Sequence, residues 1–174
     1  MLKINLIFFL VILGAAASFG FGQGSPAETV SAFYKFDGVH SQTFSRRAID
    51  ARKQWFSDDL NKLFLYELKR EAEYLKKNPT DKPYFGDGLP FRPIDETCKA
   101  GNRLLHKVLT TEPGDENAAT ATVRAIFAFP SPCTDPDKTG YTVDLVRSNG
   151  KWLIDDVRYE DGHSLKQDLK RKDY

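Results

Sequence analysis

The sequence predicts an α+β domain in which N-terminal helices pack on a strongly curved four-stranded antiparallel sheet. The longer helical patterns lie in the first half of the chain, and runs rich in β-branched and aromatic residues follow one another in the second half. The best specified stretch is Tyr141–Tyr159, where two such runs meet at Asn149-Gly150. Asn-Gly is a strong hairpin signal because both turn residues accept a positive φ.

Length and composition bound the class of protein. The chain has 174 residues, of which 41% are hydrophobic and 28% charged, and this is ordinary for one globular domain. Apart from Lys3, the basic and acidic side chains balance at 24 each and are scattered along the chain. Because binding to a phosphate backbone needs a basic surplus, we expect no nucleic-acid partner.

Residues 1–22 have the pattern of a secretory signal peptide. A positive start at Lys3 precedes the apolar run Ile4–Leu13, which is short for a bilayer span of about 20 apolar residues. Small residues follow, so we expect cleavage after Ala17 or Gly22. The prediction is an exported protein, periplasmic or extracellular, with no membrane contact after cleavage. An uncleaved N-terminal membrane anchor is the alternative.

The first helix of the mature chain should begin at Ser25. Ser25, Pro26 and Glu28 combine an N-cap serine, a proline at the first helical position and the glutamate of a capping box. Apolar residues then recur at the i, i+3, i+4 spacing of one helix face, and Gly38 indicates the end.

A longer helix is predicted at Ser57–Lys77, after a shorter helical segment at Ile49–Phe56. Ser57 supplies a cap, acidic residues fill the first turn and Pro79 stops the helix. Glu67 and Glu71 stand among basic residues and are interpreted as part of a solvated face.

The stretch Thr80–Gly101 is rich in proline and glycine but also in apolar residues. This composition argues against a regular element, yet it is too apolar for a disordered linker. We therefore expect an ordered loop that packs over an open side of the core.

Four strands are expected to follow the loop. Their predicted bounds are Arg103–Thr111, Ala118–Phe129, Tyr141–Arg147 and Lys151–Tyr159. The links are short, with turns predicted at Pro113-Gly114-Asp115 and Asn149-Gly150, so an antiparallel meander is the simplest topology. A short charged helix or frayed tail is expected at Ser164–Lys172.

The last strand changes parity near Asp155-Asp156. Trp152 and Ile154 share one face of an unbroken strand, whereas Val157 lies on the other. A β-bulge would shift the register and bend the sheet, which would give it a concave side. Partial cover on both faces is the alternative. Trp152 and Ile154 are expected to close the core.

Cys98 and Cys133 both lie in the exported part, in turn-rich stretches that flank a predicted strand pair. An oxidising compartment allows a disulfide between them. Closing this loop would contribute roughly 3 to 4 kcal/mol. We predict that they pair, since two isolated cysteines are a weak metal site and no Cys-x-x-Cys supports redox catalysis. Neither a metal nor a cofactor is expected.

The order of helices, long loop and curved sheet resembles the cystatin-like α+β cone of the nuclear transport factor 2 superfamily. The resemblance rests on the helix near Thr29–Phe36, the loop Tyr84–Phe91 and Gly-Lys-Trp-Leu-Ile-Asp-Asp-Val at Gly150–Val157. More narrowly, the chain is similar to exported bacterial domains of unknown function, and this implies one domain at residues 25–172. Members of the superfamily include isomerases, dehydratases, transport adaptors and inactive subunits, so fold does not choose a function.

Polar residues of the predicted strands suggest one catalytic hypothesis. His106, Arg124 and Asp144 lie on three strands and Asp156 on a fourth. If they shared a pocket, His106 with a carboxylate would form a general acid–base pair, and Arg124 would polarise an oxyanion. The competing interpretation is a solvated face with ion pairs, because these residues alternate with apolar ones. No nucleophile elbow or phosphate loop supports catalysis.

A second hypothesis concerns aromatic residues at the mouth of the cone. Most of them should be core, but an open mouth would turn them into an apolar ligand pocket. The candidate ligand-binding residues are Phe33, Tyr34, Tyr84, Phe85 and Phe91. Alternatively, the outer face or an edge of the sheet could join a second copy as a homodimer, or a different protein.

The function predicted from the sequence is an exported, non-catalytic binding or interaction domain for an unknown small molecule or protein partner. The alternative is a small-molecule dehydratase or isomerase that uses a His/Asp acid–base pair in the cone pocket.

Overall fold

The computed structural model describes residues 24–93, 97–133 and 138–172, so the predicted signal peptide lies outside the described residues. The helices are α1 (Pro26–Asp37), α2 (Arg46–Arg52), the 3-10 turn η1 (Lys53–Trp55), α3 (Asp58–Lys77) and α4 (Leu165–Lys170). The strands are β1 (Thr97–Ala100), β2 (Arg103–His106), β3 (Val108–Glu116), β4 (Thr120–Ala128), β5 (Thr139–Ser148) and β6 (Lys151–Arg158).

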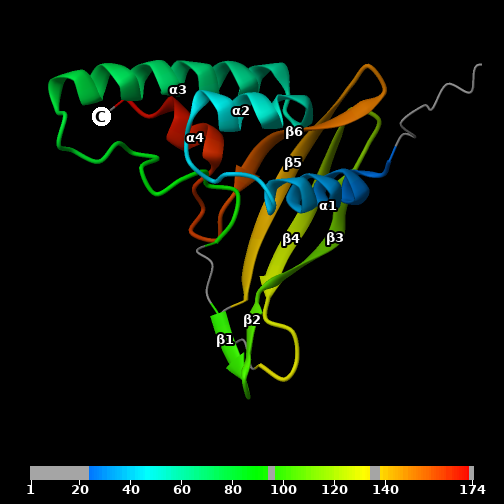
Figure 1. Ribbon diagram of the computed structural model, residues 1–174. Coiled ribbons are helices and arrows are strands. Elements are labelled where there is room, and N and C mark those ends of the chain that lie inside the picture. Colours follow the sequence, from blue (N-terminus) through cyan, green and yellow to red (C-terminus); the bar gives the residue numbers. More distant parts are fainter. Residues whose placement is uncertain (1–23, 94–96, 134–137, 173–174) are drawn as a thin grey trace, which may run out of the picture.

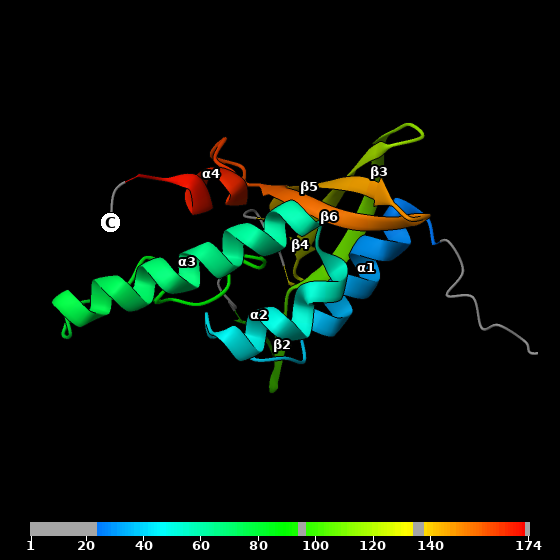
Figure 2. The same cartoon turned by 90° about the horizontal axis from the view of Figure 1, so that it is seen from above.

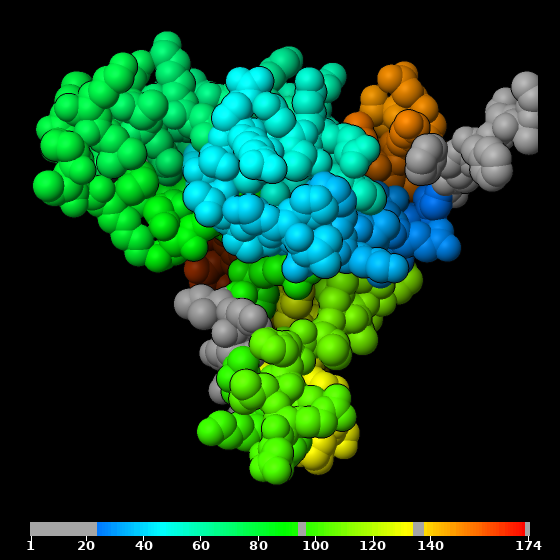
Figure 3. Space-filling view, in the orientation of Figure 1, coloured from blue at the N-terminus to red at the C-terminus, as the bar shows by residue number. Residues whose placement is uncertain are grey.

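The predicted α+β architecture is confirmed. Strands β3, β4, β5 and β6 form an antiparallel meander in that order, and α1 and α3 pack across one of its faces (Figures 1 and 2). The hairpin β1–β2 extends from the end opposite the helices. The molecule is therefore broad at its helical end and narrow at the hairpin (Figure 3).

Strand β6 contains the expected bulge. The register shifts between the Asp144–Asp156 pair and the Leu145–Ile154 pair, so Asp155 is the extra residue. Because one residue is added, Val157 faces the core like Trp152 and Ile154 before the bulge. The bulge also bends the strand. Apolar residues on both sides of the bulge are buried, namely Trp152, Ile154 and Val157.

The predicted strand Arg103–Thr111 is in fact two strands. The chain breaks at Lys107, because β2 pairs with β1 in a separate two-stranded sheet while β3 pairs with β4. Strand β1 lies in the stretch that was expected to be an irregular loop, and Gly101 turns the hairpin with a φ of 61°. A partner strand, rather than intrinsic propensity, decides this segment.

The turn predicted at Pro113-Gly114-Asp115 is also wrong. Strand β3 continues to Glu116 through an irregular register. The chain reverses at Asn117, whose Oδ1 accepts the N–H groups of Ala119 and Thr120 at 2.8 and 2.9 Å. Asparagine bonding to the backbone ahead of it makes its own turn, and this outweighs the Pro-Gly signal.

Aromatic rings fill the space between the helices and the concave face of the sheet. Phe33 packs against Tyr34, Phe56 and Phe91 with centroid distances of 5.1, 5.5 and 5.3 Å. Tyr34 in turn meets Phe127 of β4 at 5.2 Å. Such edge-to-face contacts pack an interior at high density. The inside of the cone is therefore hydrophobic core.

Helix α3 buries two acidic residues that were expected to face water. Glu67 and Glu71 are only 0% and 7% exposed. Glu67 pairs with Arg70 and accepts Arg171 Nη2 at 2.6 Å, and Glu71 accepts the Phe85 N–H at 3.0 Å. The solvated-face interpretation is wrong because α4 and the loop after α3 cover this side of the helix.

The predicted disulfide is confirmed between Cys98 and Cys133, whose Cα atoms are 6.4 Å apart. It joins β1 to the connection after β4 and so holds the hairpin against the sheet. Within the described ranges, no helix combines the length and the apolar character needed to cross a bilayer.

Candidate functional site

The four residues of the acid–base hypothesis lie on two different sheets. His106 ends β2 in the two-stranded sheet and is exposed. Arg124, Asp144 and Asp156 lie on the outer face of the four-stranded sheet, between the buried residues of their strands. There Asp144 accepts Arg158 Nη2 and Nε at 2.7 and 2.9 Å. The structure therefore does not bring these groups into one closed pocket.

The predicted ligand-binding aromatics are mostly core residues. Phe33, Tyr34 and Phe91 are fully buried, and Phe85 is 4% exposed. Their rings contact one another and the sheet, so they cannot line an open mouth. Tyr84 is the exception, since 52% of it is exposed.

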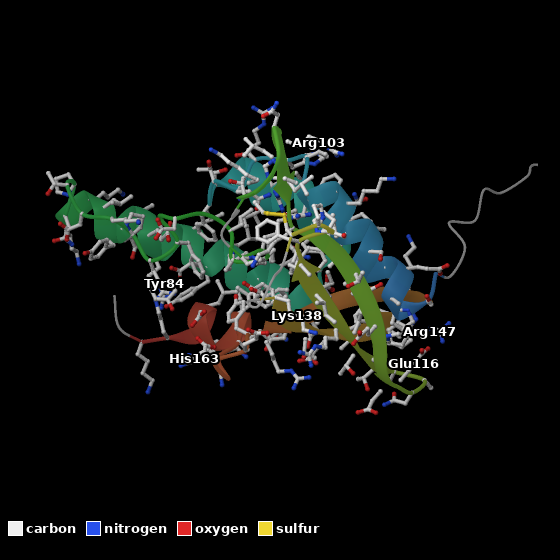
Figure 4. The ribbon with its side chains drawn as sticks, turned by 90° about the horizontal axis from the view of Figure 1, so that it is seen from below. Tyr84, Arg103, Glu116, Lys138, Arg147 and His163 are labelled. Carbon is white, nitrogen blue, oxygen red and sulfur yellow. A yellow bond between two sulfur atoms is a disulfide. The ribbon has the colours of Figure 1, made fainter. Side chains whose placement is uncertain are left out.

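Tyr84 leads to the candidate site, a surface cleft of about 490 Å³. We call it the α4 cleft, because its other walls are α4 and the turn before that helix. Figure 4 shows Tyr84 and His163 on the side of the molecule where α4 lies. The residues that line the cleft are Tyr84, Asp161, Gly162, His163, Gln167, Asp168 and Arg171.

Hydrogen bonds and a glycine with a positive φ define the turn between β6 and α4. The Tyr159 N–H donates to the His163 carbonyl at 2.9 Å, and Asp161 Oδ1 accepts the His163 N–H at 3.0 Å. Gly162 has a φ of 86°, in a region that glycine enters without steric cost. Ser164 then caps α4 through a capping box with Gln167. The turn thus holds an acid and an imidazole at the rim of the cleft.

The floor of the cleft is a stacked and hydrogen-bonded group. The Tyr84 hydroxyl donates to Asp168 Oδ1 at 3.1 Å. The Arg171 guanidinium carbon lies 3.6 Å from the centroid of the Tyr84 ring. The same guanidinium donates to the buried Glu67 carboxylate at 2.6 Å. Arg171 therefore has an internal counter-ion and a fixed place on the ring.

Electrostatics set Asp168 apart from an ordinary surface acid. Burial raises the pKa of its carboxyl group, and Asp161 adds to the rise, while the Tyr84 hydroxyl, His163 and Arg171 oppose it. Burial, together with Asp168, also raises the pKa of Tyr84. A raised carboxyl pKa means that the folded protein stabilises the carboxylate less well than water does.

The carboxylates of the bulge have a structural role instead. Lys166 Nζ lies 2.8 Å from both Asp155 Oδ1 and Asp59 Oδ2. Asp155 Oδ1 also accepts the Ser57 hydroxyl at 2.7 Å, and Asp156 Oδ1 accepts the Lys166 N–H at 2.9 Å. These contacts fasten α4 to β6 and to the start of α3. In the part of the chain that the structure describes, no three metal-binding side chains gather into a possible metal site.

Sequence analysis missed most of the α4 cleft. It named Tyr84 and placed Asp168 in a short charged helix or frayed tail, but it proposed neither Asp168 nor His163 as a site residue. Tyr84 and Asp168 are far apart in the sequence, so no periodicity or spacing connects them. The available signal was the Asp161-Gly162-His163 turn ahead of a well-capped short helix.

Comparison with known proteins finds similarity to a curated protein whose name assigns it no activity. The chain is 27% identical over 157 residues to the uncharacterized protein YqhG of Escherichia coli strain K12. The aligned region is 90% of this chain and 47% of the relative, so the chain spans about half the length of that protein. No profile of a known protein family matches the chain, and no solved structure matches it.

Proposed function

We propose that the protein is an exported, non-catalytic binding domain of the nuclear transport factor 2-like superfamily, which binds its partner on the outside of the cone. The observation that carries this proposal is the filled interior. Phe33, Phe64 and Phe91 are fully buried in the space that an internal small-molecule site would need. A site with access to solvent must then lie on the surface.

Export is supported by two independent features of the chain. The first is the short apolar run Ile4–Leu13 behind a positive start. The second is the Cys98–Cys133 disulfide, since such cross-links form and persist in oxidising compartments.

The α4 cleft supports binding at the surface. It presents a half-exposed aromatic ring, an imidazole and two carboxylates in one open depression. Concave sites that combine apolar surface with a few convergent polar groups are the usual places where proteins bind ligands. The catalytic alternative has less support, because His106 and the strand carboxylates lie on separate sheets.

Photo-crosslinking in the exported protein tests the proposal. A photoreactive phenylalanine derivative replaces Tyr84 in one variant and Val108 in the control, since Val108 is 49% exposed on the distant strand β3. We expect an adduct of reproducible mass from position 84 that is absent from position 108 and unaffected by His106→Ala. Mass analysis of the same sample should show that the signal segment is gone.

Two results would refute the proposal. If neither position gives a discrete adduct, or both give the same set, the α4 cleft is not a binding surface. If the intact precursor stays in the cytoplasm, the chain is not exported.

A further inference from the structure

We propose that the open edge of strand β3 is a dimerisation surface, where it forms an antiparallel pair with β3 of a second copy of this chain. The two four-stranded sheets then become one continuous sheet. The interface lies outside the α4 cleft and does not depend on what that cleft binds. Three observations carry the proposal: the open backbone of β3, the closed backbone of the opposite edge, and the distribution of charge from β1 to β3.

Strand β3 presents backbone groups without a partner along one side. It is the outermost strand in the order β3-β4-β5-β6, so it pairs only with β4 (Figure 1). Among the described residues, the backbone of Val108–Glu112 has no hydrogen-bond partner outside β4. Val108 and Thr110 are also exposed and β-branched, as is common in strands. An edge of this kind is a ready template for another strand.

The opposite edge of the sheet, strand β6, is covered by the protein itself. Phe56 forms a parallel bridge with Ile154, and the Ser57 N–H donates to the Ile154 carbonyl at 2.8 Å. Further along the strand, Ser164 bridges Arg158. An edge that is covered in this way does not recruit another strand. A new strand can therefore be added at β3.

The regular part of β3 sets the length of the proposed pair. The register of β3 becomes irregular between Pro113 and Glu116, and proline has no N–H to donate. Pairing is therefore confined to Val108–Glu112, which is close to the average strand length of roughly 5 to 6 residues. Thr110 lies at the centre of this stretch. Because the interface is short, the dimer should be weak.

The distribution of charge favours an antiparallel second copy. Strands β1 and β2 carry the exposed residues Lys99 and Arg103 and no acidic residue. Strand β3 carries acidic residues and no basic one, namely Glu112, Asp115 and Glu116. Figure 4 shows Arg103 at the tip of the hairpin and Glu116 far from it. Antiparallel pairing brings the basic hairpin of each copy toward the acidic end of the other, whereas parallel pairing would set like charges side by side.

Analytical ultracentrifugation of the full exported protein tests the proposal. We expect monomers at low concentration and dimers at high concentration, with a dissociation constant on the order of 10 to 100 µM for so short an interface. Added salt should weaken the dimer, because opposite charges contribute to it. A protein that stays monomeric up to about 1 mM would overturn the proposal.

Exchange of charges distinguishes this interface from any other dimer contact. Arg103→Glu and Glu116→Lys should each weaken the dimer about tenfold, because two-fold symmetry places the new repulsion in both contacts. An equimolar mixture of the two variants should restore the dimer, since both contacts of the mixed dimer then join opposite charges. Glu73→Lys, at an exposed position of α3, makes the same change of charge and should have no effect. A mixture as weak as its components would contradict the proposal.

Disulfide trapping locates the pairing on β3. Two copies of Thr110→Cys should meet across the interface and form a covalent dimer under mild oxidation. Lys151→Cys, at an exposed position of β6, is the control and should stay monomeric. Circular dichroism verifies the fold of each variant. A covalent dimer from both variants, or from neither, would refute pairing at β3.

Photo-crosslinking separates this proposal from binding at the α4 cleft. The photoreactive residue at position 108 should give an adduct of twice the mass of the chain, and the residue at position 84 should not. An adduct of position 108 with a different protein would rule out a second copy as the partner. Loss of the adduct at position 84 alone would remove binding at the α4 cleft and leave the β3 interface in place.

Discussion

Replacing Asp37 by asparagine should lower the stability of the protein markedly, because this carboxylate bridges two guanidiniums inside the core. It lies at the end of α1 and is fully buried. Its Oδ1 accepts Arg52 Nε at 2.7 Å, and its Oδ2 accepts Arg92 Nε at 2.8 Å. Asparagine keeps the shape of the side chain but removes the charge and turns an amide N–H group toward one of the guanidiniums.

The magnitude follows from the burial of the two arginines. Removing one partner of a buried ion pair costs about 3 to 5 kcal/mol, since the remaining charge stays desolvated. Arg52 is fully buried, whereas the Arg92 side chain is 30% exposed and can gain water. Arg52 also keeps its bonds to the carbonyls of Ala48 and Ser41. We therefore expect the lower end, about 3 kcal/mol, or roughly 6 to 12 °C in Tm for a domain of this size.

Urea unfolding followed by tryptophan fluorescence measures this loss. Asp50→Asn is the matched control, because the Arg46–Asp50 pair has a similar distance of 2.8 Å but side chains that are 70% and 48% exposed. Exposed pairs contribute about 0.2 to 1 kcal/mol, so the control should unfold almost like the unmodified protein. If the two variants share one midpoint at an unchanged slope, burial does not set the strength of the Asp37 pair.

Three further predictions concern the cross-link, the core and the cleft. Reducing Cys98–Cys133, which are 35 residues apart, should cost about 4 kcal/mol by loop entropy; calorimetry showing an unchanged Tm would contradict it. Phe91→Ala should cost about 3 to 5 kcal/mol in urea unfolding, and Tyr84→Ala far less; equal losses would show that the core is misassigned. Asp168→Asn should stabilise the protein at neutral pH. Burial raises the pKa of Asp168, so the folded state holds that proton more tightly and loses stability as pH rises from the unfolded to the folded pKa. Asparagine removes this penalty. Urea unfolding at about pH 3, below the unfolded pKa, should therefore show no gain in the free energy of unfolding. A gain of equal size at neutral pH and at pH 3 would rule out the carboxyl group as its cause.

Features that depend only on a few neighbouring residues could be predicted from the sequence. The capping box at Ser25, the Asn149-Gly150 turn and the bulge at Asp155 each depend on local backbone chemistry, and the structure contains all three. Their signals need no knowledge of distant parts of the chain. The number and order of strands in the main sheet followed from these signals.

Features decided by distant parts of the chain could not be predicted. Glu67 has the polarity of a surface residue, and its burial is tolerable because Arg171, from the far end of the chain, joins the neighbouring Arg70 in pairing with it. The hairpin β1–β2 exists because β2 leaves the main sheet to pair with β1. The α4 cleft is of the same kind, because Tyr84 and Asp168 meet only after α4 has docked.

The docking of α4 connects stability with the candidate site. Lys166 fastens the start of the helix to the bulge, and Arg171, just beyond its end, fastens the chain to the buried Glu67. Because both ends are held by ion pairs, Asp168 in between is fixed against Tyr84, whose hydroxyl donates to its Oδ1 at 3.1 Å. The anchors give the helix its place, while the acid between them carries the unfavourable desolvation.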